Sequence, residues 1–248
     1  GWWSTARCAD DMEPALDIGK QAGRRALGKV GAKKISTKKI PVVFEAPIAS
    51  GMLRHFVSAV SGGNLYRQQS FLEGVIGESV FPDFFSIEED PFVPRGLSSS
   101  AFDNEGVQTE KRSIVSSGRL EGLFLSTYSA RKLGLASTGN AGGAHNLSVH
   151  ARGHTHQFGE LLKMMDTGFL VTDLLGHGTN MVTGDYSRGA SGFWVEKGEI
   201  IHPVQEVTVA GNLKDMFKTI RGVGNDHLNR SSFKVGSLLI DSMTVGGD

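Results

Sequence analysis

Apolar residues recur along this chain of 248 residues with helical spacing in some stretches and as short extended runs in others. Residues 12–30 carry apolar side chains about three and four positions apart, which predicts an amphipathic helix. Asp10 or Asp11 can cap its N-terminus, because a short polar side chain accepts hydrogen bonds from the first free amide groups. Three glycines within this segment each lower helix stability by up to about 1 kcal/mol, so packing must stabilise the helix.

Three later segments also have helical spacing. Residues 47–63 follow a predicted strand, and Pro47 suits the first turn of a helix because its missing N–H is not needed there. Residues 126–133 predict a short helix that ends at a glycine. Asn212 is a suitable cap for the last predicted helix, which we expect to end at Gly222.

Short apolar and β-branched runs between turn residues predict strands. We expect strands at residues 39–46, 104–115, 120–125, 169–172, 181–184, 192–196, 200–203, 207–210 and 237–240. Turns at residues 116–118 and at Lys197-Gly198 make hairpins of the strands beside them. Strands that follow one another through short turns favour an α+β fold, with mainly antiparallel or mixed curved sheets and a few flanking helices.

Composition narrows the class of protein. Lys plus Arg and Asp plus Glu balance at 26 each, so no overall field attracts the chain to nucleic acid or to an anionic membrane. The apolar runs are too short to span a bilayer, and we expect no membrane association. The single cysteine, Cys8, cannot form an internal disulfide, which fits a cytoplasmic location.

Four histidines lie close together in the sequence and are weak candidates for metal ligands: His145, His150, His154 and His156. A glycine interrupts the segment, and no acidic residue follows His150 to act as a general base. A solvated polar loop explains the same residues. A weak zinc or nickel site is the alternative.

Three consecutive carboxylates, Glu88, Glu89 and Asp90, form an acidic group that could bind a hard cation. Neighbouring side chains of a strand point to opposite faces, so the three cannot converge on one ion. A solvated strand end is therefore the preferred interpretation.

A glycine-rich segment near residue 188 is the candidate surface for contact with substrate or partner. Glycines in strands weaken packing and are tolerated where another backbone approaches, so we expect valine at Gly189 or Gly192 to impair activity more than folding. Arg188 could bind a carboxylate through its planar fork, or it could pair with Asp185 to brace a bulge. The candidate contact residues are Asp185, Tyr186, Ser187, Arg188, Gly189 and Gly192.

Signals for other chemistry are absent from the sequence. No serine lies in the Gly-x-Ser-x-Gly pattern of a nucleophile elbow, and Cys8 has no histidine nearby in the sequence. Residues 139–143, although glycine-rich, lack the Lys-Ser/Thr ending of a phosphate loop. We therefore assign no catalytic residue to this chain.

Several long strings give the chain a specific resemblance. They are residues 62–67 (GGNLYR), 94–97 (PRGL), 102–106 (FDNEG), 128–134 (YSARKLG), 142–146 (GGAHN) and 184–199. From Arg7 to Val245 the chain resembles the C-terminal portion of the PmbA/TldE family.

That resemblance implies a bacterial cytoplasmic protein that pairs with a TldD-like protease subunit. The pair would be a zinc metalloprotease that processes or degrades peptides, with peptides as substrates. The resemblance also implies that residues 1–248 form a C-terminal domain, that residues 1–35 are a linking helical segment, and that an N-terminal domain is missing.

The metal-bearing partner in that family has a helix of the form His-Glu-x-x-x-His and a distant cysteine ligand. The matching helix here is residues 47–63, where His55 is followed by Phe56 and Ala59 stands one turn later. Zinc needs about three protein ligands and a base. We therefore expect no metal and no other cofactor in this chain, and zinc in the partner subunit.

Two alternatives from other classes remain. One is an autonomous metallopeptidase that uses the histidines between His145 and His156. The other is a non-enzymatic interaction protein, in line with the family's older description as a modulator of DNA gyrase. The neutral charge gives no sign of direct contact with nucleic acid.

Overall fold

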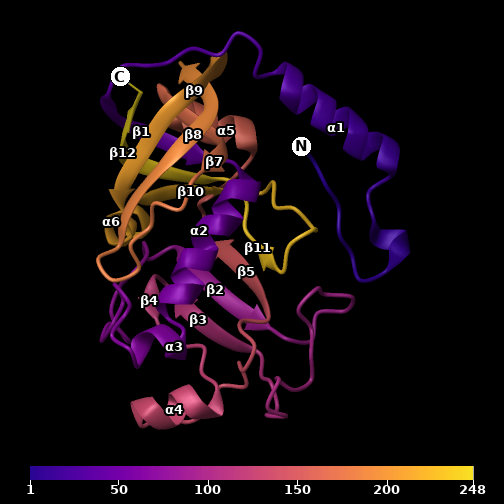
Figure 1. The fold of residues 1–248 in the computed structure, drawn as a ribbon, viewed down its shortest axis with the longest axis vertical. Coiled ribbons are helices and arrows are strands. Elements are labelled where there is room, and N and C mark those ends of the chain that lie inside the picture. The colour runs from indigo at the N-terminus through magenta and orange to yellow at the C-terminus, as the bar shows by residue number, and fades with distance from the viewer. Residues whose placement is uncertain (248) are drawn as a thin grey trace.

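The computed structural model describes residues 1–247, and two sheets make up most of the body (Figure 1). The larger sheet has seven strands in the order β1-β7-β8-β9-β12-β10-β6. Its strands are β1 (Lys38–Phe44), β6 (Thr155–His156), β7 (Gly168–Leu175), β8 (Asp185–Glu196), β9 (Glu199–Asn212), β10 (Ile220–Gly224) and β12 (Leu238–Gly246).

Five strands of the larger sheet close on themselves. β1 pairs in parallel with β7 and antiparallel with β12, so the ring β1-β7-β8-β9-β12 has no free edge. Successive residues of β1 show the two faces: Val42 and Phe44 belong to the main core, whereas Val43 packs in a smaller cluster with Leu161 and Leu239. This alternation follows from the two-residue period of a strand.

The smaller sheet has five strands in the order β11-β5-β2-β3-β4. They are β2 (Phe85–Asp90), β3 (Arg112–Ser116), β4 (Arg119–Leu120), β5 (Asn146–Ala151) and β11 (Phe233–Lys234). The predicted turn between β3 and β4 is confirmed. Ser117 and Gly118 have φ angles of 45° and 78°, and a side chain at Gly118 would collide with the backbone at Phe81.

Within residues 1–247, six α-helices and one short 3₁₀ helix surround the sheets. They are η1 (Ala9–Asp11), α1 (Ala15–Leu27), α2 (Ala46–Ala59), α3 (Gly62–Leu65), α4 (Thr127–Leu133), α5 (Phe158–Met165) and α6 (Leu213–Lys218). Figure 1 shows α2 running from the larger sheet toward the smaller one, with α5 and α6 beside the larger sheet and α3 and α4 beyond the smaller. Met52 and Phe56 of α2 are buried in the main core.

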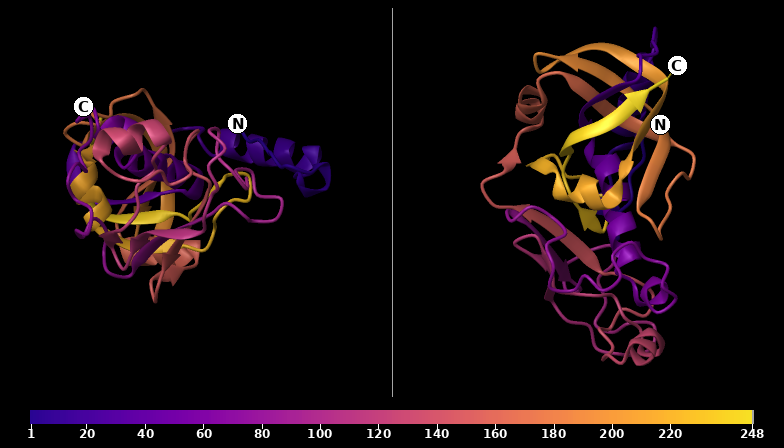
Figure 2. Two further views of the ribbon diagram at one scale, coloured as in Figure 1. Left: turned by 90° about the horizontal axis from the view of Figure 1, so that it is seen from below. Right: turned by 90° about the vertical axis from the view of Figure 1, so that its left-hand side faces the viewer.

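The first helix projects from the body, as Figure 2 shows. It begins at Ala15 after Pro14, so the expectation that Asp10 or Asp11 caps it is wrong; both lie in η1. Leu16 and Leu27 are 68% and 74% exposed. The residue before a proline avoids the helical conformation, which explains why the helix cannot begin earlier.

Polar contacts and aromatic rings attach the N-terminal segment to the body. Arg25 donates two hydrogen bonds to the Glu45 carboxylate, at 2.7 and 2.8 Å. The guanidinium of Arg230 lies 3.7 Å from the ring centroid of Trp2 and 4.8 Å from that of Trp3. Arg230 also donates to the Trp3 carbonyl at 2.6 Å. Cation–π contacts therefore hold the two tryptophans.

Three further expectations differ from the structure. Residues 181–184 form a turn rather than a strand, because the loop between β7 and β8 folds back on β8. Residues 200–203 and 207–210 belong to one continuous strand, β9. Helix α6 ends at Lys218, and Gly222 lies within β10, where pairing with β12 decides its conformation.

Two expected strands are much shorter in the structure. The strand expected at 104–115 begins only at Arg112, because Asp103 accepts hydrogen bonds from the amides of Glu105 and Val107 and holds that segment in a turn. Of the strand expected at 120–125, only Leu120 lies in a strand, β4.

Several other expectations are confirmed. The fold is α+β with mixed sheets, as the turn signals predicted. Ser126 caps α4 by accepting from the Ser129 amide, and Gly134 ends the helix with φ of 69°. Asn212 accepts from the Lys214 amide at the start of α6. Within residues 1–247, no helix combines the length and the apolar character that crossing a membrane requires.

Candidate functional site

Three residues of helix α2 bear on metal binding, and their side chains point in different directions. Phe56 and Ala59 have no exposed surface, and the Phe56 ring packs 5.1 Å from Phe81 and 6.1 Å from Phe217 between centroids. His55 is only partly buried and faces β8 instead. Val60, where the second His of the pattern His-Glu-x-x-x-His would fall, is also fully buried, so the positions of that pattern's base and second ligand are part of the apolar core.

His55, Tyr186 and Arg188 form a small group between α2 and β8. The rings of His55 and Tyr186 meet edge to face, with centroids 6.1 Å apart. Burial lowers the pKa of His55, and the positive charge of Arg188 lowers it further. Burial raises the pKa of Tyr186 to about 12, although Arg188 opposes part of that shift. At neutral pH, Tyr186 is thus a protonated hydroxyl and His55 favours its neutral form.

Unsatisfied polar atoms collect on this face of β8. The Tyr186 hydroxyl, Arg188 Nε and Thr179 Oγ1 are all buried and have no hydrogen-bond partner in the described part of the chain. Thr179 lies opposite Tyr186 in an antiparallel bridge, and opposed residues share a face, as do residues two apart in a strand. Because native proteins leave few buried polar groups unpaired, three on one face mark a candidate binding site.

Asp185 does not pair with Arg188. Its carboxylate accepts from Thr183 Oγ1 at 2.6 Å and from Asn212 Nδ2 at 3.1 Å. These two hydrogen bonds, Thr183 first, lower the pKa of Asp185. The interpretation of Arg188 as a structural partner of Asp185 is therefore wrong, and Arg188 has no carboxylate partner within the described chain.

The remaining candidate contact residues, Ser187, Gly189 and Gly192, differ in their exposure to solvent. Ser187 is exposed and lines an open pocket of about 380 Å³ together with Asp185 and Tyr186. Gly189 is partly buried, and a Cβ there would only touch Leu175 at 3.4 Å. Gly192 is buried, and a Cβ there would collide with the Leu170 carbonyl oxygen of β7. The backbone that approaches Gly192 is therefore the chain's own.

The four histidines proposed as weak metal ligands have separate environments. His145 is 8% exposed, and its ring nitrogens lie 3.1 Å from the Ser98 carbonyl oxygen and 3.0 Å from that of Gly139. His150 is exposed on β5. His154 stacks on Phe84 at 3.9 Å, and its centroid is 6.4 Å from that of His156. A uniformly solvated loop is thus the wrong description.

Residues suited to zinc do not converge in the part of the chain that the structure describes. Within residues 1–247, no three or more His, Cys, Asp or Glu side chains are grouped so as to hold a metal ion. Helix α2 offers His55 alone, and Cys8 lies in the N-terminal segment beside η1. This donor set does not fit a zinc site of about three protein ligands.

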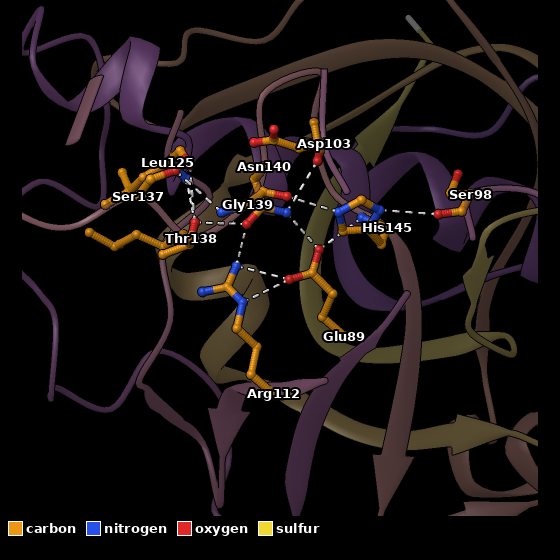
Figure 3. Close-up of polar contacts among 12 residues, drawn as sticks. Glu89, Ser98, Asp103, Arg112, Leu125, Ser137, Thr138, Gly139, Asn140 and His145 are labelled. Carbon is orange, nitrogen blue, oxygen red and sulfur yellow. Dashed lines mark hydrogen bonds and ion pairs between the residues drawn. The ribbon is translucent and has the colours of Figure 1, made fainter. Parts of the chain in front are cut away.

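The acidic group at the end of β2 is not uniformly solvated, which corrects the preferred interpretation. Glu89 is 1% exposed, whereas Glu88 and Asp90 form surface ion pairs with Lys111. The Glu89 carboxylate accepts from Arg112 Nε at 2.9 Å and from Asn140 Nδ2 at 2.8 Å. Figure 3 shows these side chains meeting below His145, whose backbone amide also donates to Glu89.

A second buried carboxylate belongs to the same region. Burial opposes ionisation of Asp103, but hydrogen bonds from the backbone amides of Ala141, Val107 and Glu105 outweigh it and lower the pKa of this residue. Asp103 and His145 come from two of the strings that carry the family resemblance. Those strings therefore meet in a buried polar network that ties loops together (Figure 3).

Three members of this network, Arg112, Thr138 and Asn140, were missed in the sequence. Arg112 donates to Asn140 Oδ1 at 2.7 Å, and Thr138 donates to the same oxygen at 2.7 Å. Arg112 and Asn140 lie 23 and 51 residues from Glu89, so no local pattern connects the three.

Comparisons with known proteins agree with the resemblance in the sequence. The profile of the PmbA/TldA metallopeptidase C-terminal domain matches residues 37–247. The "Metalloprotease PmbA" of Escherichia coli O157:H7 is 46% identical over 245 residues, which cover 99% of this chain and 54% of that protein. A Haemophilus influenzae homologue of the same name is 45% identical with the same coverage. The chain thus spans about half the length of these curated relatives.

Solved structures share the fold. A Bacteroides thetaiotaomicron protein described as a modulator of DNA gyrase superposes with a TM-score of 0.93 at 31% identity, over all of this chain and 55% of that one. TldE from Thermococcus kodakarensis gives a TM-score of 0.79 at 22% identity, over 94% of this chain and 55% of that one. At that identity the second comparison shows the fold alone.

Proposed function

Since this chain belongs to the PmbA/TldA metallopeptidase family, we propose that it is the subunit that completes the substrate channel of a TldD/TldE-type zinc protease. In this proposal the TldD-like partner holds the zinc and the catalytic groups. The pair processes or degrades peptides in the cytoplasm. This chain supplies a surface and binds neither membrane nor nucleic acid.

The observation that carries the proposal is the state of α2. Counted from His55, the pattern His-Glu-x-x-x-His would place the base at Phe56 and the second zinc ligand at Val60, and both are fully buried in apolar packing, as is Ala59 one turn after His55. Of these positions only His55 lies outside the apolar core; it is partly buried, and its ring faces Tyr186. A helix built in this way is suited to supporting a binding surface rather than to activating a water molecule.

The surface that we assign to substrate or partner is the segment of β8 from Asp185 to Gly189. Ser187 is exposed on one face of this segment beside the pocket at the loop between β7 and β8, and the opposite face presents Arg188, whose buried Nε has no hydrogen-bond partner within residues 1–247. Polar donors without partners are costly in isolation and are satisfied when a ligand supplies acceptors. Contact with a peptide or with the partner subunit at this surface would supply hydrogen-bond acceptors to these donors and so lower the free energy of the complex.

Reconstitution tests the proposal. Peptide hydrolysis is measured for this chain, for a TldD-type partner and for their mixture, with the matched variants Ser187→Trp and Ser113→Trp. Both serines are exposed on strands, Ser187 on β8 and Ser113 on β3 of the other sheet. We expect activity from the mixture well above that of either component, and loss only with Ser187→Trp.

Two results would contradict the proposal. Hydrolysis by this chain alone would favour an autonomous metallopeptidase. A partner whose activity is unchanged by this chain would favour a separate interaction protein.

A further inference from the structure

The guanidinium of Arg188 is partly buried and has no counterion among residues 1–247. Its Nε is fully covered and without a hydrogen-bond partner, and the neighbouring Asp185 carboxylate is held by Thr183 and Asn212 instead. A desolvated charge costs free energy unless an opposite charge or hydrogen bonds compensate. This environment is therefore incomplete without an anion.

The groups around Arg188 are donors. The Tyr186 hydroxyl is protonated at neutral pH and lies close enough to Arg188 for the guanidinium to oppose the rise in its pKa, but it has no hydrogen bond of normal geometry, and the His55 ring lies beside the Tyr186 ring. Thr179 adds a further unpaired hydroxyl on the same face. Only Arg188 has a full positive charge at neutral pH, so the group matches a monoanion better than a dianionic phosphate.

The three side chains differ in exposure. Tyr186 is 1% exposed, whereas His55 and Arg188 keep part of their surface in solvent. On this face Tyr186 lies opposite Gly211 of β9, which carries no side chain, whereas Arg188 lies opposite the buried Val209. A small anionic group can therefore approach the guanidinium from solvent.

We propose that Arg188 binds the terminal carboxylate of a peptide, with Tyr186 as a second donor and His55 beside it. Two carboxylate oxygens match the planar fork of a guanidinium. The peptide as ligand rests on the proposed function, whereas the carboxylate chemistry rests on these side chains alone. Recognition of this kind would select the C-terminal end of a substrate and fix its register along β8.

Binding to the isolated chain tests the inference without the partner subunit. The NMR signal of Arg188 Nε–H is followed during titration with an apolar tripeptide that has a free C-terminus, with its C-terminal amide, and with an amidated peptide ending in Glu. We expect the free tripeptide to shift this signal saturably and the two amides to leave it unchanged. Equal shifts with all three peptides, or a stronger response to inorganic phosphate, would overturn the inference.

Matched variants separate binding from folding. Arg188→Lys keeps the charge but loses the fork, and it should weaken binding of the free tripeptide about tenfold or more. Arg221→Lys is the control, since Arg221 is exposed on β10 and pairs with Asp241. Arg221→Lys should leave the affinity unchanged.

Tyr186→Phe gives a second, independent readout. Because the hydroxyl has no partner in the free chain, its removal should not lower thermal stability, yet it should weaken binding of the free tripeptide several-fold. Unchanged affinity in both Arg188→Lys and Tyr186→Phe would rule out the site. Such a result, with an active reconstituted pair, would leave the proposed function intact and remove only its carboxylate recognition.

Discussion

His55 of α2 and Tyr186 of β8 meet edge to face, with ring centroids 6.1 Å apart and planes at 77°. This contact joins the helix that corresponds to the family's metal-binding helix to the strand that we assign to ligand contact. His55 is thus in contact with an aromatic ring, and the positive charge of Arg188 is close enough to lower its pKa.

The titration of His55 follows from this contact. Burial and the Arg188 charge hold its pKa below 6.5, so the native chain binds fewer protons here than the unfolded chain. Stability should therefore fall as pH decreases below 6.5 toward the lowered pKa. Arg188→Met removes one of the two causes, and the His55 midpoint in an NMR titration should rise toward 6.5.

Arg221→Met is the matched control for that titration, because Arg221 lies at an exposed ion pair with Asp241. It should leave the His55 midpoint unchanged. A midpoint that does not respond to Arg188→Met would show that Arg188 is not close to the ring in solution.

The two glycines of β8 should respond differently to substitution. A Cβ at Gly192 would collide with the Leu170 carbonyl oxygen, so Gly192→Ala should lower the free energy of unfolding by about 2 kcal/mol or more. A Cβ at Gly189 meets Leu175 at an ordinary 3.4 Å, and Gly189→Ala should change stability by less than about 0.5 kcal/mol. Urea denaturation measures both. Equal effects would contradict the β7–β8 register.

This difference changes an expectation from the sequence. Valine at Gly192 was expected to affect activity more than folding, but β7 occupies the space that the side chain would need. Gly189 keeps that expectation. A glycine-rich strand predicts a close approach, but the sequence does not say whether the approaching backbone belongs to the same chain.

Local signals succeeded where the responsible contacts are close in sequence. Ser126 and Gly134 define both ends of α4, because capping needs only neighbouring backbone groups. The prediction that Gly222 ends the last helix is wrong, because the contacts that decide its conformation are distant in sequence. Helix α6 ends four residues earlier, and pairing between β10 and β12 sets the conformation there.

The candidate site could be predicted only in part. Arg188 and Tyr186 were found because they flank a glycine-rich strand, and His55 because of its place in the family's helix. Their mutual contact could not be predicted, because α2 and β8 are more than a hundred residues apart and meet only through tertiary packing. No sequence motif pointed to Thr179.

Glu89 should be a larger contributor to stability than its acidic neighbour. Glu89→Gln leaves Arg112 without a carboxylate in a buried network, and we expect a loss of about 3 kcal/mol in the free energy of unfolding. Glu88→Gln removes only an exposed pair with Lys111 and should cost less than about 1 kcal/mol. Denaturant midpoints compare the two directly. Equal losses would place Glu89 at the surface.

The pH dependence of stability tests the hydrogen bonds that we assign to Asp103. Its pKa in the folded chain is lowered below 3.8, so its stabilising contribution is present above that pH and is lost as pH falls through the lowered pKa. Asp103→Asn should therefore reduce stability near neutral pH and flatten its decline in acid. Thermal unfolding at several pH values would show this, and parallel pH curves for the two proteins would contradict it.

Zinc content tests the central claim most directly. Zinc is measured by mass spectrometry in this chain alone and in its complex with a TldD-type partner. The account predicts one zinc per pair, retained by the partner on separation, and no stoichiometric zinc in this chain. About one tightly held zinc per isolated chain, lost in His55→Ala, would contradict the account.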